Sequence, residues 1–179
     1  MFDKILKLLV DHINQKLRRA KTALETEEKA KDIAFLQGNI IGWRKLFDYI
    51  IDFFPDFEPD IEEEEVQRID GLETPEIEEL CAQKELLIVS AEWEGLLKKV
   101  EGNREFLKET LITTADSARD LYLAQAQQKG LTDYITLFDI LDTERINRKS
   151  ELNFNDGDEP TDEQTVEQIE TALEELPIE

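Results

Sequence analysis

The sequence predicts an all-α protein with two tandem, duplicated antiparallel helical hairpins packed as a bundle, an acidic linker and a short C-terminal helix. Apolar residues recur at steps of three and four along most of the 179 residues, which is the spacing of a buried helix face. The 7 Gly and 5 Pro are too few for a β-sandwich with many tight turns. Ile88-Val89 is β-prone, but it is too short for a strand and sits inside a helical pattern.

The first hairpin is expected over residues 1–54. Its first helix (2–25) has an apolar stripe at helical spacing, and its second (27–54) has a near-heptad stripe typical of a packed helix. Thr26 lies between them as a candidate N-cap, because its hydroxyl can accept a bond from a first-turn amide. Pro55 then ends the second helix, since proline lacks the N–H that a helix interior requires.

An acidic linker is expected over residues 55–73 and the second hairpin over residues 74–149. Thr74 as N-cap and Pro75 at the first helical position begin a helix that we expect to run to about residue 112. The hairpin is completed by a helix expected over residues 115–147.

Two features of this second half leave alternatives open. The long helix is either continuous or breaks near Ser90 or Gly95. Asn103 falls where the stripe should have an apolar residue, so it either fixes the register through a polar contact or lies in water at the edge of the stripe. We favour water, because polar side chains mostly stay solvated.

The two halves match when the chain is shifted by 88 residues, so that residues 31–43 lie over residues 119–131. Identical small and polar residues recur: Thr26, Ala30, Asp32, Gln37 and Gly42, as Thr114, Ala118, Asp120, Gln125 and Gly130. Any two amphipathic helices share an apolar phase, but that does not account for the shared Asp, Gln and Gly. We interpret the match as a duplicated hairpin.

Small residues spaced four apart form the candidate helix-packing set. Such spacing lets a neighbouring helix approach closely, and each mid-helix Gly otherwise costs about 1 kcal/mol of helix propensity. We expect them to mark tight packing inside each hairpin, with a contact between copies of the chain as the open alternative. The set, with the adjacent tryptophan, is Gly38, Gly42, Trp43, Ala126 and Gly130.

The stretch DIAFLQGNIIGW (32–43) resembles a pattern in small helical virion or assembly-associated proteins of tailed bacteriophages. The matching residues are Asp32, Leu36, Gln37, Gly38, Ile40 and Trp43. The second copy departs from the pattern, with Ala126 for the glycine and Gln128 for the apolar residue. The resemblance covers about 13 residues per copy. It implies a phage origin more strongly than any activity, and it supplies no catalytic residues.

No catalytic or metal-binding pattern stands out in the sequence. The single His12 is expected at a helix surface or interface, and the single Cys81 is expected to be partly buried, with acidic neighbours that raise its thiol pKa. The segment 155–159 suggests an EF-hand loop, but Leu152 and Phe154 would occupy ligand positions. We therefore expect no enzymatic activity, no cofactor and no specific metal site.

The net charge of −22 is concentrated in two segments. Residues 51–80 carry −12 and residues 151–179 carry −11, so the hairpins are nearly neutral. In the acidic tail (150–179), Thr161 and Gln164 form a capping box before a short amphipathic helix. This helix docks either on its own bundle or on a partner. Candidate partner-binding residues are Val166, Ile169, Leu173 and Leu176 of the tail, and Glu62, Glu63, Glu64 and Glu65 of the linker.

The charge also limits the partners. Phosphate contacts need cations, so we expect no direct binding to nucleic acid or to an anionic membrane. Without a recognisable signal peptide or transmembrane stretch, the host cytoplasm or a virion is the expected location. The sequence predicts a non-enzymatic protein–protein interaction protein, a bacteriophage virion or assembly component that contacts other subunits. The alternative is an acidic nucleic-acid mimic that inhibits a basic host DNA-binding protein or nuclease.

Overall fold

The computed structural model describes residues 2–59, 69–114 and 117–155, and every regular element in these ranges is helical. The elements are α1 (Asp3–Thr26), α2 (Ala30–Phe53), the 3-10 turn η1 (Ile69–Gly71), α3 (Thr74–Ile88), α4 (Ala91–Thr114), α5 (Ala118–Leu131) and α6 (Asp133–Asn155). The predicted all-α class and the helical bundle are confirmed. Within the described ranges, no helix has both the length and the apolar character needed to cross a membrane.

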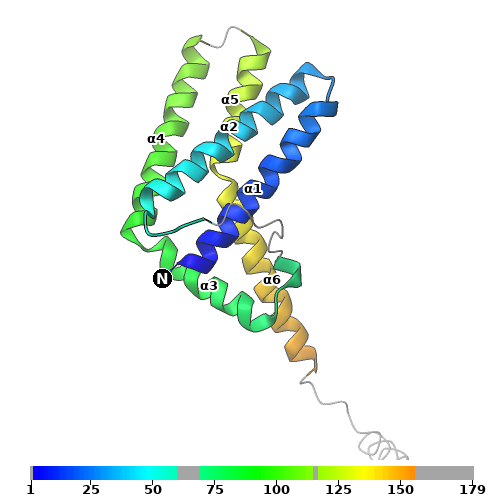
Figure 1. The fold of residues 1–179 in the computed structure, drawn as a ribbon, viewed down its shortest axis with the longest axis vertical. Coiled ribbons are helices and arrows are strands. Elements are labelled where there is room, and N and C mark those ends of the chain that lie inside the picture. Colours follow the sequence, from blue (N-terminus) through cyan, green and yellow to red (C-terminus); the bar gives the residue numbers. More distant parts are fainter. Residues whose placement is uncertain (1, 60–68, 115–116, 156–179) are drawn as a thin grey trace, which may run out of the picture. The chain divides into compact units, whose positions relative to one another are not determined.

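The chain divides into two compact units, residues 1–145 and 146–179. The described part of the second unit, residues 146–155, forms the last turns of α6. In the first unit α1 runs antiparallel to α2, and α4 runs antiparallel to α5 (Figure 1). The α1–α2 connection and the end of α4 lie at one end of this bundle, and α3 crosses the other end (Figure 1).

The first two helices lie close to their predicted positions, but two predicted caps are wrong. Thr26 is the last residue of α1, and its hydroxyl donates to the Ala23 carbonyl oxygen (3.3 Å) instead of capping α2. At α3 the N-cap is Glu73 rather than Thr74, and the Glu73 amide donates to the Glu76 carboxylate (2.8 Å). The two side chains form a capping box, in which the Glu73 carboxylate takes the capping role predicted for the Thr74 hydroxyl.

Both long helices predicted for the second half are interrupted. The helix expected from residue 74 to residue 112 breaks at Val89-Ser90, where the Ser90 hydroxyl accepts a bond from the Trp93 amide (3.2 Å). The prediction of a single helix over residues 115–147 is wrong, because α5 and α6 are separated at Thr132. The Thr132 hydroxyl donates to the Gln128 carbonyl oxygen (3.2 Å), a local bond of the kind that competes with regular helix geometry.

The core of the first unit combines residues from all six helices. Trp93 of α4 is 2% exposed, and its ring lies 5.3 Å from that of Tyr134 and 5.6 Å from that of Phe138, both in α6. Each fully buried large apolar side chain contributes about 1.5–3 kcal/mol. Other fully buried members are Ile5, Leu9 and Ile13 of α1, Leu46 and Ile50 of α2, Ile77 and Leu87 of α3, and Leu96 and Leu131.

The small residues of α2 and α5 lie in direct contact. A Cβ placed on Gly42 would lie 2.4 Å from the Gln127 carbonyl oxygen and 2.9 Å from Gly130 Cα. A Cβ on Gly38 would lie 2.8 Å from the Ala126 Cβ. The tight packing therefore lies between the two hairpins, and our expectation that it lies inside each hairpin is wrong.

This helix contact is reciprocal in sequence. Gly42 faces residues 127, 130 and 131, and Gly130 faces residues 39, 42 and 43, which are the same positions 88 residues earlier. The helix bounds follow the same interval: α4 begins and ends 88 residues after α1, and α5 begins 88 residues after α2.

Candidate functional site

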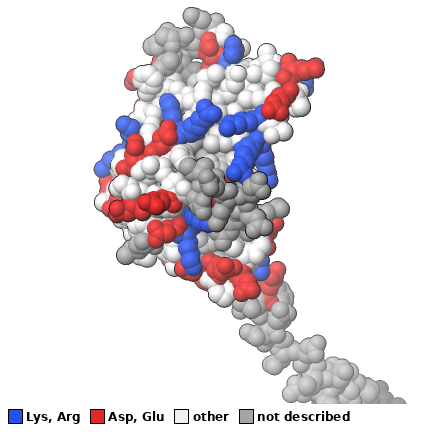
Figure 2. All heavy atoms as spheres, in the orientation of Figure 1, with Lys and Arg blue, Asp and Glu red and all other residues white. Residues whose placement is uncertain are grey.

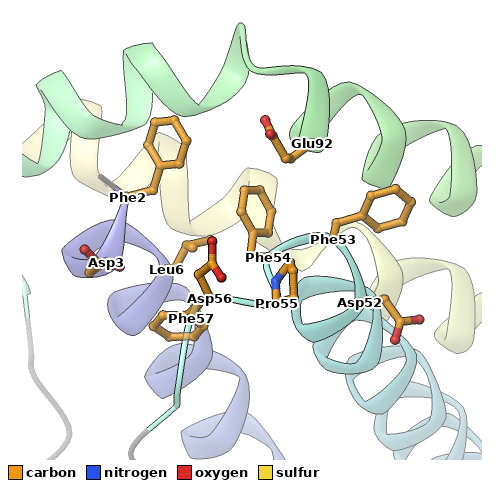
Figure 3. Close-up of a pocket in the computed structure, with 10 residues that line it drawn as sticks. All are labelled: Phe2, Asp3, Leu6, Asp52, Phe53, Phe54, Pro55, Asp56, Phe57 and Glu92. Carbon is orange, nitrogen blue, oxygen red and sulfur yellow. The ribbon is translucent and has the colours of Figure 1, made fainter.

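A pocket of about 560 Å³ opens where the start of α1, the end of α2 and the start of α4 meet. Its apolar side is formed by four phenylalanines and Leu6 (Figure 3). The rings of Phe2 and Phe54 pack edge to face with centroids 6.3 Å apart. Phe54, Phe57 and Leu6 are buried, whereas Phe2 and Phe53 are only partly covered. The pocket thus offers aromatic surface to an incoming side chain.

Carboxylates surround this aromatic surface. Glu92 and Asp56 lie on either side of Phe54, and Asp3 and Asp52 lie toward opposite ends of the pocket (Figure 3). All four carboxylates are on exposed residues, and none of the ten lining residues is a lysine or an arginine. Aromatic faces and carboxylates together are the groups that hold ammonium or guanidinium side chains.

Local sequence explains why the phenylalanines gather here. Pro55 ends α2 at Phe53, because it cannot continue the helical hydrogen-bond ladder. The chain then turns, with the Phe57 amide donating to the Phe54 carbonyl oxygen (3.0 Å). Phe53 lies against Gly95 of α4, where a Cβ would come within 2.6 Å of its ring. Gly95 therefore allows α4 to approach the end of α2.

The joint between α3 and α4 exposes a group of large apolar side chains beside the start of α4. Leu86 is 54% exposed, Ile88 47% and Val89 78%. We call these three residues the elbow patch. Three large apolar side chains exposed within four positions of one joint are typical of a surface that contacts another protein.

Near the α1 N-terminus, α3 is held by α1 and α6. Lys4 pairs with Glu79, and the Ile5 amide donates to the Gln83 side chain (3.3 Å). From α6, Arg145 contacts Glu78 (3.4 Å) and Glu85 (2.7 Å), so cations of the bundle meet the acidic face of α3. Lys84 of α3 is buried and pairs with Asp142.

A buried polar cluster centres on Asp133 at the start of α6. Its carboxylate accepts bonds from the Trp43 indole N–H and from His12, both at 3.1 Å, with Lys16 Nζ 3.8 Å away. Burial alone raises the pKa of Asp133, but the His12 bond, the Lys16 charge and the Trp43 bond together hold this pKa below its usual value. His12 thus lies at a helix interface and supports structure. Its partner is an aspartate far away in sequence.

Asn103 is half-buried and bonded to α2 rather than simply hydrated. Its amide donates to the Tyr49 hydroxyl, and its side-chain oxygen accepts from Lys45 Nζ (3.2 Å). Burial raises the pKa of Tyr49, against the smaller lowering effect of the Asn103 bond. The favoured interpretation of Asn103 as a solvated edge residue is therefore wrong, since it links α4 to α2.

Cys81 is fully buried rather than partly buried, with Sγ 4.0 Å from the Leu141 carbonyl oxygen. Burial is the main cause that raises its thiol pKa, while Arg145 and Lys84 act in the opposite direction. The acidic neighbours invoked from sequence are not the main cause. Among the described residues, no group of three or more His, Cys, Asp or Glu side chains is arranged to hold a metal ion.

Of the sequence-predicted site residues, the structure brings together the helix-packing set. The candidate partner-binding residues Glu62–Glu65, and Val166, Ile169, Leu173 and Leu176, lie outside the described residues. The pocket was not predicted, although the run Phe53-Phe54-Pro55-Asp56-Phe57 could have indicated it. Phe2 and Glu92 carry no such signal, because only the fold brings them there.

Comparison with known proteins gives no relative. The chain matches no family model, and neither the curated proteins nor the solved structures contain a significant match.

Proposed function

We propose that this chain is a non-enzymatic helical protein that binds other proteins through the face formed by the elbow patch and the neighbouring pocket. The observation that carries the proposal is the exposure of Leu86, Ile88 and Val89 at one joint, because apolar side chains exposed close together mark contact surfaces more often than apolar side chains exposed singly. The phage-like motif at residues 32–43 supports a role as a virion or assembly component.

We also propose that the two hairpins descend from one duplicated unit. The equal helix bounds and the reciprocal contact of Gly42 and Gly130 support this origin. Reciprocal contacts between equivalent positions are the mark of a two-fold interface. The α2–α5 contact would then replace a dimer contact between two separate copies of the ancestral hairpin.

The nucleic-acid mimic has less support. Mimicry needs carboxylates spread over a rigid face at phosphate-like spacing. On the face shown in Figure 2, lysine and arginine side chains lie among the acidic ones. The acidic runs that could supply such a face are outside the described residues.

The proposed function is tested by fractionating particles and free proteins from cells that make the full chain. Co-purification with particle or coat proteins at a fixed ratio supports the proposal. Binding to a basic nuclease or polymerase that DNA competes away supports the mimic instead.

A pair of variants locates the contact. V89E should abolish association, because it places a charge in the elbow patch, and I140E should preserve it. Ile140 is 45% exposed on α6 and serves as a matched apolar control. If the two variants behave alike, the elbow patch is not the contact.

A further inference from the structure

We propose that the pocket binds a basic, amphipathic segment of a partner protein. Through the 88-residue interval, the pocket corresponds to the surface of the bundle that holds α3, which we call the α3 site. This proposal rests on the proposed protein-binding function and adds the chemistry of the partner. It is carried by the correspondence between two sites and by the loss of the two bundle cations, Lys4 and Arg145, at the second of them.

The correspondence follows from the 88-residue interval. The bundle residues that contact α3 through the bonds described above are Lys4, Ile5, Leu141, Asp142 and Arg145. Their counterparts are Glu92, Trp93, Phe53, Phe54 and Phe57. Four of these five, all except the buried Trp93, line the pocket. The pocket is therefore the counterpart of the surface that holds α3.

The charges of the two sites differ in sign. At the α3 site, Lys4 and Arg145 of the bundle meet glutamates of α3, and one bundle carboxylate, Asp142, pairs with Lys84 of α3. In the pocket their counterparts are Glu92 and Phe57, and the rim adds Asp3, Asp52 and Asp56. An acidic helix like α3 would be repelled there, whereas a segment that carries lysine or arginine would be attracted.

The size and surface of the pocket indicate how such a segment binds. A volume of about 560 Å³ accommodates one or two large side chains rather than a whole helix. An apolar anchor can pack on the partly exposed rings of Phe2 and Phe53 while flanking cations reach Asp56 and Glu92. Cations placed over the phenylalanine faces gain a further cation–π attraction.

Charge argues against an occupant from the chain's own acidic end. Residues 151–179 include 11 acidic residues and no lysine or arginine. Their sign is the same as that of the rim. A basic partner is the complementary occupant.

The test uses two peptides built on α3. The first has the sequence of residues 74–88 with E76K, E78K, E79K and E85K, and the second keeps the natural glutamates; both carry C81S. Fluorescence anisotropy with the full chain should show that the lysine peptide binds at least tenfold more tightly than the glutamate peptide. This affinity should fall steeply as salt is raised.

Charge-reversal variants of the full chain then locate the binding. D56K/E92K should weaken lysine-peptide binding at least tenfold, while D48K/D139K, with the same change in net charge outside the pocket, should leave it within twofold. All four residues are exposed, so the fold should tolerate these changes. Equal losses in both double variants, or equal binding of the two peptides, would overturn the proposal.

Two further outcomes identify other occupants and also overturn it. Binding that appears only after residues 156–179 are removed assigns the pocket to the chain's own end. A dimer that D56K/E92K dissolves assigns it to a second copy. If the peptide fails while V89E still abolishes partner association, only the pocket assignment is wrong; if partner association is also absent, the proposed function fails.

Discussion

The two halves of the bundle differ most where their central helices end. In the first half, Pro55 stops α2 at Phe53, and the turning chain places Phe54 and Phe57 in the pocket. In the second half, the corresponding position is Thr143, and α6 continues to Asn155. The same positions then remain helical and hold α3. The presence of Pro55 in the first half, and of Thr143 at the same position in the second, thus accounts for the difference between the pocket and the surface that holds α3.

In the middle of the central helices, it is the second half that is interrupted. Helix α2 is continuous through Arg44, whereas the residue 88 positions later, Thr132, separates α5 from α6. The break places Asp133 at the start of α6, where its carboxylate accepts the Trp43 and His12 bonds. Its own counterpart, Lys45, instead bonds Asn103 of α4. Equivalent positions therefore link the two hairpins through different polar chemistry.

The largest expected effect comes from a substitution that disrupts the contact between α2 and α5. G42A should destabilise the bundle by about 3 kcal/mol, because a Cβ would lie 2.4 Å from a backbone oxygen that only a helix shift can move. Urea unfolding followed by circular dichroism measures the loss.

The matched control for G42A is G102A in α4. A Cβ at Gly102 meets nothing within 4 Å, so alanine should stabilise the helix by up to about 1 kcal/mol. If both alanines stabilise, the close approach of α2 and α5 is not required for the fold.

The second prediction concerns the buried polar cluster around Asp133, which has no equivalent at Lys45 in the first half. D133A should cost about 2 kcal/mol, since it leaves the buried Trp43 N–H without its acceptor. Tryptophan fluorescence during urea unfolding reports the change. The exposed Asp139 provides the control, and D139A should have an effect below about 0.5 kcal/mol. Equal effects of D133A and D139A on the free energy of unfolding would show that the cluster does not stabilise the fold.

The third prediction is the pH dependence of that cluster. Because the folded-state pKa of Asp133 lies below its usual value, its charged form stabilises the protein at neutral pH. This contribution is complete above the unfolded-state pKa of about 4 and is lost as the pH falls through the folded-state value. The stability difference between wild type and D133N should therefore shrink below about pH 4. A constant difference from pH 7 to pH 3 contradicts the assignment.

The smallest expected effect sharpens the comparison at the α3 site. R145A should cost about 0.5–1 kcal/mol, because the guanidinium pairs with two partly exposed glutamates of α3. Hydrogen exchange should show faster opening of α3 in this variant. K98A, which removes an exposed pair inside α4, should leave α3 unchanged.

Sequence periodicity predicted the helices of the first half well, since an apolar stripe specifies which face is buried. It missed both breaks of the second half or left them open. At Thr132 the stripe continues in phase across the interruption, and no proline marks it. Such a break depends on a local side-chain bond and on packing against α1, neither of which alters the spacing of apolar residues.

The candidate site was less accessible from sequence. Small residues predicted close helix packing, but spacing alone could not say which helix would be the partner. The pocket joins Phe2, Phe54 and Glu92, which are distant in sequence, and the proline that creates it was recognised only as a helix stop. Long-range assembly of this kind is specified by the whole core rather than by any local pattern.

The burial of Cys81 makes its alkylation rate a measure of how often α3 separates from the bundle. The thiol is inaccessible while α3 lies against α6, and burial keeps its pKa raised, so alkylating reagents react only when this helix separates from the bundle. The chain contains one cysteine, so every modified molecule records the same event. Alkylation rates measured without denaturant thus give the frequency with which α3 detaches, relative to the unfolding of the whole.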